Sequence, residues 1–298
     1  MTNPDDGAAT LDLLTDNLQR RNTLADWMFY EISGLSKAEF ALLSGQVNDE
    51  GAILVVEPAN GSDQAAIQKF SSFDAFRNEP GDLLRHFTVA GVGSSDVGAA
   101  ALARTLANHV DAPVGAVVAG YGLSDLLAEA MGGWMFFRTA NQALHLMGLA
   151  QQFAHQPNAR RAVPEGIEVI DAGHGIRSDT RTLIRLLSER ERKIETLLGH
   201  SKGCLSIAYA LQAIASLSNA DHFARAADTA VITAGAVVAF PPGLRRLSQY
   251  LGTLDWFGGV NSRPGVYYKP VFGAWHHLNT SLPLAMDLKS VLAADFRD

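Results

Sequence analysis

The sequence predicts an α/β protein whose core is a mainly parallel sheet with helices on both faces. Short apolar runs that suit buried strands recur regularly from about residue 86 onward. Segments of helical length separate these runs, and neighbouring parallel strands need such long crossover connections. The 298 residues are 47% hydrophobic and 18% charged, so the chain can bury a large core and is not disordered.

The N-terminal part of the chain is less regular. Residues 11–32 carry apolar side chains at helical spacing, which predicts a helix. Residues 52–56 read Ala-Ile-Leu-Val-Val and end at Glu57-Pro58, which predicts a strand. Residues 60–81 are mixed, and we expect a helix flanked by loops. We therefore treat residues 1–85 as a helical and strand flank or cap, and residues 86–298 as the core.

From residue 86 the expected strands and helices alternate. Apolar runs predict strands at 86–90, 114–119, 167–170, 194–198, 229–234, 250–254 and 266–272. Ala-rich or amphipathic stretches predict helices at 97–110, 180–193 and 202–217, and another long helix from about residue 124. Ligands of parallel sheets bind at the carboxyl ends of the strands, so functional residues are expected just after strands.

Charge and cysteine content exclude several classes of function. Lys and Arg number 24 against 31 Asp and Glu, and a net charge of −7 argues against a nucleic-acid partner. The single Cys204 excludes an internal disulfide and a cysteine-only zinc site.

Location follows from the ends and the apolar stretches of the chain. The N-terminus lacks a basic signal region, and charged residues interrupt the apolar stretch 113–137. We expect no integral membrane segment and a cytoplasmic protein, and the sequence leaves a homo-oligomer open.

The sharpest motif is Gly199-His200-Ser201-Lys202-Gly203, which has the form G-x-S-x-G. It follows an apolar strand directly and opens a predicted helix. A serine on such a tight, strained turn needs small flanking residues, because side chains there would clash with neighbouring backbone. The free N–H groups of the helix N-terminus would face developing negative charge. The motif therefore predicts a nucleophilic serine, Ser201.

Residues 113–280 resemble the α/β-hydrolase superfamily, through four landmarks that occur in the family's order. The first is the run 116–122, which is similar to the strand and oxyanion turn His-Gly-x-Gly, with Ala119 in place of the histidine. The second is the run 169–179, similar to a strand followed by Asp-x-x-Gly-His-Gly-x-Ser. The third is the serine motif. The fourth is the run 273–279, similar to Gly-x-Gly-His, with Trp275 replacing a glycine.

Two adjacent histidines are candidates for the general base. A catalytic imidazole must reach the serine from a loop while a carboxylate orients its other nitrogen. His276 and His277 both follow the predicted last strand. The family pattern aligns with His276, which we prefer, and His277 remains the alternative.

The family order of serine, acid and histidine requires a carboxylate between residues 201 and 276. Asp221 and Asp228 precede a predicted strand, which places them at the wrong end of the sheet. Asp255 follows the predicted strand 250–254 and enters a loop, so it satisfies both order and location. We expect Asp255 to orient the base.

The resemblance implies an oxyanion hole made of backbone N–H groups. We assign these to Lys202 and to Tyr121 or Gly122, and we rank the glycine turn 91–93 second because another strand and helix separate it from the serine motif. We expect the Lys202 side chain to expose a positive charge beside the nucleophile, and Cys204 to be buried packing behind it.

The resemblance implies an α/β-hydrolase fold and a serine hydrolase that cleaves a small-molecule carboxylic ester or thioester through an acyl-enzyme. It implies no metal and no organic cofactor. Two alternatives remain open: an acyltransferase that uses the same site, and a non-catalytic binding protein of the same fold.

Overall fold

The computed structural model describes residues 25–46, 48–59, 61, 66–78, 84–91, 94–119, 178–216 and 220–296. Within these ranges the strands form one sheet of eight, in the order β2-β1-β4-β3-β5-β6-β7-β8. Their bounds are β1 Ile53–Val56, β2 Ile67–Phe70, β3 His86–Val89, β4 Val114–Val117, β5 Thr196–His200, β6 Ala230–Ala234, β7 Arg246–Gly252 and β8 Lys269–Val271.

The sheet is mostly parallel. The strands β3 to β8 run in one direction, and only β1 is antiparallel to its neighbours β2 and β4. Strand β3 lies between β4 and β5, so the two strands that flank β5 are β3 and β6. The carboxyl ends of β3, β5, β6, β7 and β8 consequently meet along one edge.

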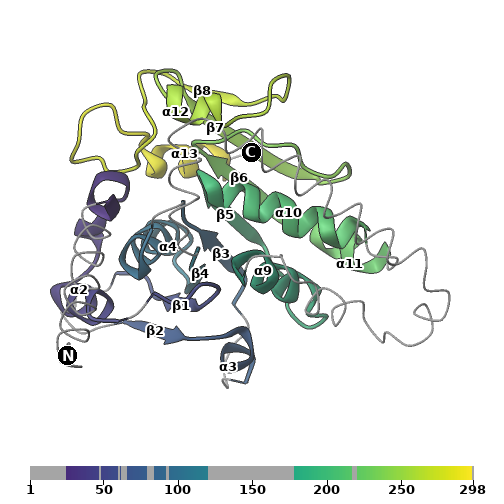
Figure 1. Ribbon diagram of the computed structural model, residues 1–298, viewed down its shortest axis with the longest axis horizontal. Helices are drawn as coiled ribbons and strands as arrows, with labels where there is room; N and C mark the ends of the chain where they lie inside the picture. Colours follow the sequence, from purple (N-terminus) through teal and green to yellow (C-terminus); the bar gives the residue numbers. More distant parts are fainter. Residues whose placement is uncertain are drawn as a thin grey trace, which may run out of the picture.

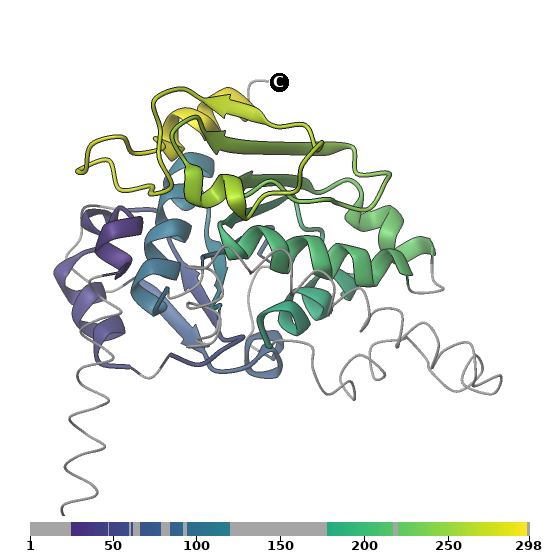
Figure 2. The same cartoon turned by 45° about the horizontal axis from the view of Figure 1, so that its top comes forward.

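Helices cover both faces of this sheet (Figure 1). The described helices are η1 Ile32–Gly34, α2 Lys37–Ser44, α3 Phe73–Arg77, α4 Asp96–Val110, α9 Ser178–Ser188, α10 Lys202–Ser216, α11 Ala220–Ala226, α12 Trp256–Val260 and α13 Leu288–Asp295. One core cluster joins the sheet to α4 and α13, and another joins it to α9 and α10. Figure 2 shows α9 and α10 together on one side and α4 with the N-terminal helices on the other.

Most of the expected elements within the described residues are confirmed with boundaries shifted by a few residues. Residues 96–110, 178–188 and 202–216 are helical, and each expected strand that can be compared is present. The expectations at 11–24, at the helix from about 124 and at 167–170 lie outside the described residues.

The expectation for residues 60–81 was wrong in part. Residues Ile67–Phe70 form a strand, and the helix α3 covers only the short stretch Phe73–Arg77. Ile67 and Phe70 are buried, whereas Gln68 is exposed, and every residue of this strand pairs with β1. Pairing with a neighbouring strand therefore decides the conformation of a segment whose own pattern is ambiguous.

The described residues before 86 share the core of the rest of the chain. Strands β1 and β2 extend the common sheet, and Tyr30, Leu35 and Leu43 pack in the cluster around α4. The N-terminal residues therefore contact the elements that carry the candidate site. No helix in the described part of the chain has the length and apolar character needed to cross a membrane.

Candidate active site

Three of the residues singled out from the sequence meet at the carboxyl edge of the sheet. Ser201 follows β5, Asp255 follows β7 and His276 lies in the loop after β8. Each is buried, with 6% of Ser201, 3% of Asp255 and 2% of His276 exposed. The site thus lies where ligands of a parallel sheet bind.

Ser201 sits on a strained turn between β5 and α10. Its φ of 52° lies in the left-handed region, which costs a non-glycine residue about 1–3 kcal/mol and persists only where the surrounding structure enforces it. A Cβ on Gly203 would overlap the carbonyl oxygen of Val89, and a Cβ on Gly199 would lie 2.9 Å from the backbone nitrogen of Cys204. The two glycines of the motif therefore permit the close packing that holds the serine in this conformation.

The three side chains form a continuous chain of hydrogen bonds. His276 Nε2 lies 3.0 Å from Ser201 Oγ, and His276 Nδ1 lies 2.8 Å from Asp255 Oδ2. Since the Asp255 carboxylate accepts a hydrogen bond from Nδ1–H, Nε2 carries a lone pair that can accept the hydroxyl proton. This is the arrangement of nucleophile, base and orienting acid that acyl transfer requires.

Asp255 is held in place by the helix that it begins. It is the N-cap of α12, and its Oδ1 accepts a hydrogen bond of 2.6 Å from Gly258 N. The other oxygen, Oδ2, is thereby directed toward His276. The rings of Phe257 and Phe29 contact His276 edge-on, with centroid distances of 4.8 Å and 5.9 Å. Together these contacts restrict the imidazole to one orientation.

His277 is not brought to the serine. Its Nε2 donates to the carbonyl oxygen of Pro283 at 3.0 Å, and its ring meets Trp275 edge-on. Its backbone carbonyl accepts from Met286 N at 2.8 Å. Of the pair, His276 therefore contacts Ser201, while His277 bonds to the carbonyl of Pro283.

The other carboxylates considered from the sequence do not approach the site. Asp228 pairs with Arg245 at 2.5 Å on the exposed surface, before the first residue of β6. The backbone of Asp221 belongs to α11, which also precedes β6. Both positions are at the amino end of that strand, opposite the serine.

The structure brings the turn after β3 beside the serine. A Cβ placed on Gly91 would lie 3.1 Å from Ser201 Cβ. Lys202, the first residue of α10, is adjacent to the serine in sequence. Tyr121, Gly122 and the second and third residues of the turn 91–93 lie outside the described residues. The reason for ranking the 91–93 turn second was wrong, because β3 pairs directly with β5 and β4 lies one strand further away.

Two expectations about the start of α10 have different outcomes. The expectation that Lys202 exposes its charge was wrong, because only 2% of the residue is exposed. Burial of Cys204 is confirmed: it is fully buried, and burial raises the pKa of its thiol to about 12. A thiol that stays protonated is a poor nucleophile, so Cys204 is a poor candidate for that role.

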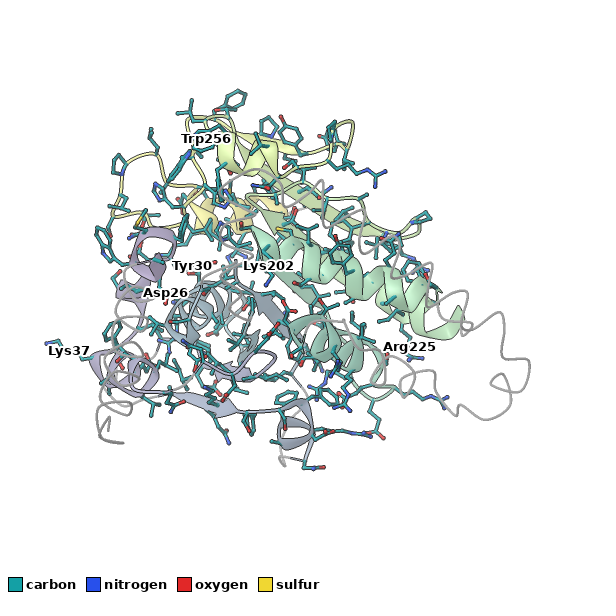
Figure 3. The ribbon with its side chains drawn as sticks, viewed as in Figure 1. Asp26, Tyr30, Lys37, Lys202, Arg225 and Trp256 are labelled. Atoms are coloured by element: carbon teal, nitrogen blue, oxygen red, sulfur yellow. The ribbon has the colours of Figure 1, made fainter. Side chains whose placement is uncertain are left out.

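Sequence reasoning missed two polar side chains that complete the site. Tyr30, from the N-terminal segment, and His200, from the serine motif, are both buried and hydrogen-bonded to each other. Figure 3 shows Tyr30 close to Lys202 at the start of α10. Nothing in the sequence near residue 30 signals this contact, because its partner is 170 residues away.

Within the described residues no group of three or more His, Cys, Asp or Glu side chains is arranged to hold a metal ion. No family model matches the sequence, and no curated protein or solved structure matches it.

Proposed function

We propose that this chain is a serine hydrolase that cleaves a carboxylic ester or thioester through an acyl-enzyme intermediate. The observation that carries the proposal is the hydrogen-bonded chain from Ser201 Oγ through His276 to Asp255. Strain at the serine, burial of all three residues and their place at the carboxyl edge support the same assignment.

Acylation begins when Ser201 Oγ attacks the carbonyl carbon of the substrate. The hydroxyl proton passes to His276 Nε2, and the Asp255 carboxylate stabilises the imidazolium that forms. The tetrahedral intermediate then expels an alcohol or a thiol, which takes the proton from Nε2. The acyl group remains bonded to Ser201 Oγ.

Deacylation uses the same groups in the reverse roles. A water molecule attacks the acyl carbon and gives a proton to His276 Nε2. Collapse of the second tetrahedral intermediate returns that proton to Ser201 Oγ and releases the carboxylic acid. The negative charge of each intermediate needs fixed hydrogen-bond donors, and we assign one to the backbone N–H of Lys202 at the N-terminus of α10.

We also propose that the fold is that of the α/β-hydrolases. In that fold the nucleophile stands on a strand-to-helix turn, one oxyanion donor follows the nucleophile, and the second comes from the loop between the third strand and the next helix. Here Ser201 joins β5 to α10, and Gly91, in the loop between β3 and α4, lies beside it. The chain order of serine, acid and histidine is the same. The substrate class, ester or thioester, rests on analogy with this fold.

A fluorophosphonate probe tests the proposal directly. The probe's phosphorus is attacked by an activated serine hydroxyl and loses fluoride, so stable labelling requires an intact nucleophile and base. We expect the purified chain to be labelled and to hydrolyse a short p-nitrophenyl ester. Ser201→Ala should abolish both reactions while leaving the thermal unfolding midpoint within a few degrees.

Ser216→Ala is the matched control, because Ser216 is an exposed serine on the same helix whose hydroxyl donates to the local carbonyl of Gln212. It should be labelled at the normal rate. Unchanged turnover in Ser201→Ala, or no labelling of the unaltered protein, would remove the serine mechanism.

A further inference from the structure

Two buried polar side chains beside the triad take no part in the proton transfers described above. Tyr30 Oη lies 3.0 Å from His200 Nδ1, and His200 Nε2 lies 2.9 Å from the carbonyl oxygen of His276. Gly91 N donates to Tyr30 Oη at 2.6 Å. These contacts form a bridge from the turn after β3, through the serine motif, to the loop that carries the base.

The hydrogen-bonding groups at each contact determine which atom donates and which accepts along this bridge. The His276 carbonyl can only accept, so His200 Nε2 carries the hydrogen and His200 Nδ1 accepts from the Tyr30 hydroxyl. The Tyr30 oxygen in turn accepts from Gly91 N–H. Burial, with a smaller contribution from the neighbouring His276, lowers the pKa of His200 to about 3, so the ring stays neutral. The bridge therefore keeps one arrangement throughout the neutral pH range.

Both ends of the bridge lie on backbone that borders the nucleophile. A Cβ on Gly91 would lie 3.1 Å from Ser201 Cβ and 3.2 Å from Tyr30 Oη. At the other end the bridge holds the main chain of His276, the residue whose Nε2 must meet Ser201 Oγ. A shift of Gly91 would change the surroundings of Ser201, and a shift of the His276 main chain would change the distance from His276 Nε2 to Ser201 Oγ.

Gly235 lies against both His200 and His276, with little room for a larger residue there. A Cβ on Gly235 would lie 3.2 Å from His200 Nε2 and 3.1 Å from His276 Cε1. Gly235 has a φ of 75°, which favours glycine, so the backbone there can approach both imidazoles. The two rings are consequently held at a centroid distance of 5.1 Å.

We propose that Tyr30 is a positioning residue for the hydrolase reaction, acting through Gly91 at one end and through His200 and the His276 backbone at the other. The inference rests on the proposed function. In this proposal the N-terminal segment contributes to the active site, because the Tyr30 hydroxyl connects the turn after β3 to the loop that carries His276.

The segment that carries Tyr30 is held in place by hydrogen bonds that do not involve the Tyr30 hydroxyl. Asp26 accepts hydrogen bonds from the backbone and hydroxyl of Ser95 at the start of α4. The carbonyl oxygen of Phe29 accepts from Leu278 N at 2.8 Å. Tyr30→Phe should therefore leave the segment docked and remove only the bridge, which makes it an informative substitution.

The test compares Tyr30→Phe with Tyr250→Phe. Tyr250 is also buried, and its hydroxyl donates to Asp295 at 2.9 Å, away from the serine. For each variant we would measure kcat and KM for a p-nitrophenyl ester, the rate of fluorophosphonate labelling and the unfolding midpoint. A misplacement of about 1 Å at a reacting group can cost on the order of 10²-fold.

We expect Tyr30→Phe to lower kcat and the labelling rate by about 10- to 100-fold. KM should stay within about twofold, and the loss of unfolding temperature should match that of Tyr250→Phe. The variant pair Tyr30→Phe and His200→Phe sharpens the test, because residues of one bridge act non-additively. The double variant should be little slower than either single variant.

A kcat for Tyr30→Phe within twofold of the control would overturn the inference, and so would an effect confined to KM or to the unfolding midpoint. If His200→Phe does not fold, Tyr30→Phe and its control still decide the matter. If the unaltered protein neither hydrolyses the ester nor reacts with the probe, the proposed function fails and the inference falls with it. A reactive protein with an unaffected Tyr30→Phe variant rejects the inference alone.

Discussion

Two buried histidines beside the serine, His276 and His200, have contrasting surroundings. Their ring centroids are 5.1 Å apart, and 2% and 1% of the two residues are exposed. His276 has a carboxylate at one nitrogen and a hydroxyl at the other. His200 has a phenol and a backbone carbonyl, both uncharged.

This contrast shows that burial beside the serine is not what makes a general base. A base must gain a proton during the reaction, and the imidazolium then needs a charged partner in a site from which water is excluded. Asp255 supplies that partner to His276. His200 has no carboxylate partner among the described residues, and its two nitrogens contact the Tyr30 hydroxyl and the His276 carbonyl. In the proposed mechanism it therefore connects segments of the site and does not transfer protons.

The largest expected effect is the loss of the base. His276→Ala should lower the acylation rate by on the order of 10⁵- to 10⁶-fold, as expected for loss of a triad member that acts as a unit with the nucleophile. His277→Ala should lose less than about tenfold, because His277 bonds to Pro283 and faces away from the serine. Single-turnover acylation of both purified variants measures the difference. A collapse in His277→Ala with a near-normal rate in His276→Ala would transfer the role to the neighbour.

The next effect concerns the charge beside the base. Asp255→Asn keeps the shape of the side chain but removes the charge that stabilises the imidazolium and selects its tautomer, so kcat should fall about 10⁴-fold. Asp228→Asn is the matched control, because it removes an exposed carboxylate paired with Arg245 at the other end of the sheet. Steady-state kinetics of the two variants test the assignment. Equal activities would show that Asp255 has no part in the reaction.

How much of the site the sequence predicts depends on how local each signal is. The serine motif and the strand before it occupy adjacent residues, so Ser201 can be found by pattern alone. Asp255 and His276 are also predictable, because each follows an apolar run and the family order restricts the choice. The structure brings the three together with the distances that acyl transfer needs.

The position of Gly91 and the bridge through Tyr30 depend on which segments become neighbours in the fold. No single segment of the sequence indicates that order. Residues 86–90 and 114–119 are both apolar runs followed by glycine turns. Pairing across the sheet places the first beside β5, which brings Gly91 to the serine. The bridge through Tyr30 joins residues 61 and 170 positions apart, so no local pattern can reveal it.

The smallest expected effect is on the pH dependence of the free energy of unfolding. It distinguishes two buried groups, Asp26 and His200, whose pKa values are shifted in opposite directions. Burial raises the pKa of Asp26 to about 7, while hydrogen bonds from Ser95 oppose the rise. Between about pH 4 and 7, Asp26 is therefore protonated in the folded state and ionised in the unfolded state. Its contribution to the free energy of unfolding falls as the pH rises through this range, and it is lost above about pH 7. His200 acts with the opposite sign: its folded pKa lies below its unfolded value, so its contribution is lost as pH falls from about 6.5 toward 3.

Asp26→Asn should remove the group that opposes His200, so that the effect of His200 on the pH dependence of stability becomes visible. Relative to the unaltered protein, the stability of this variant should rise between pH 4.5 and 6.5 with an additional slope of up to about 1.4 kcal/mol per pH unit, the value for one proton. Urea unfolding at several pH values measures this slope. Asp74→Asn, which changes an exposed carboxylate on α3, should follow the profile of the unaltered protein. Parallel curves for Asp26→Asn and the unaltered protein would mean that Asp26 ionises alike in both states, and that the N-terminal segment docks through a charged carboxylate.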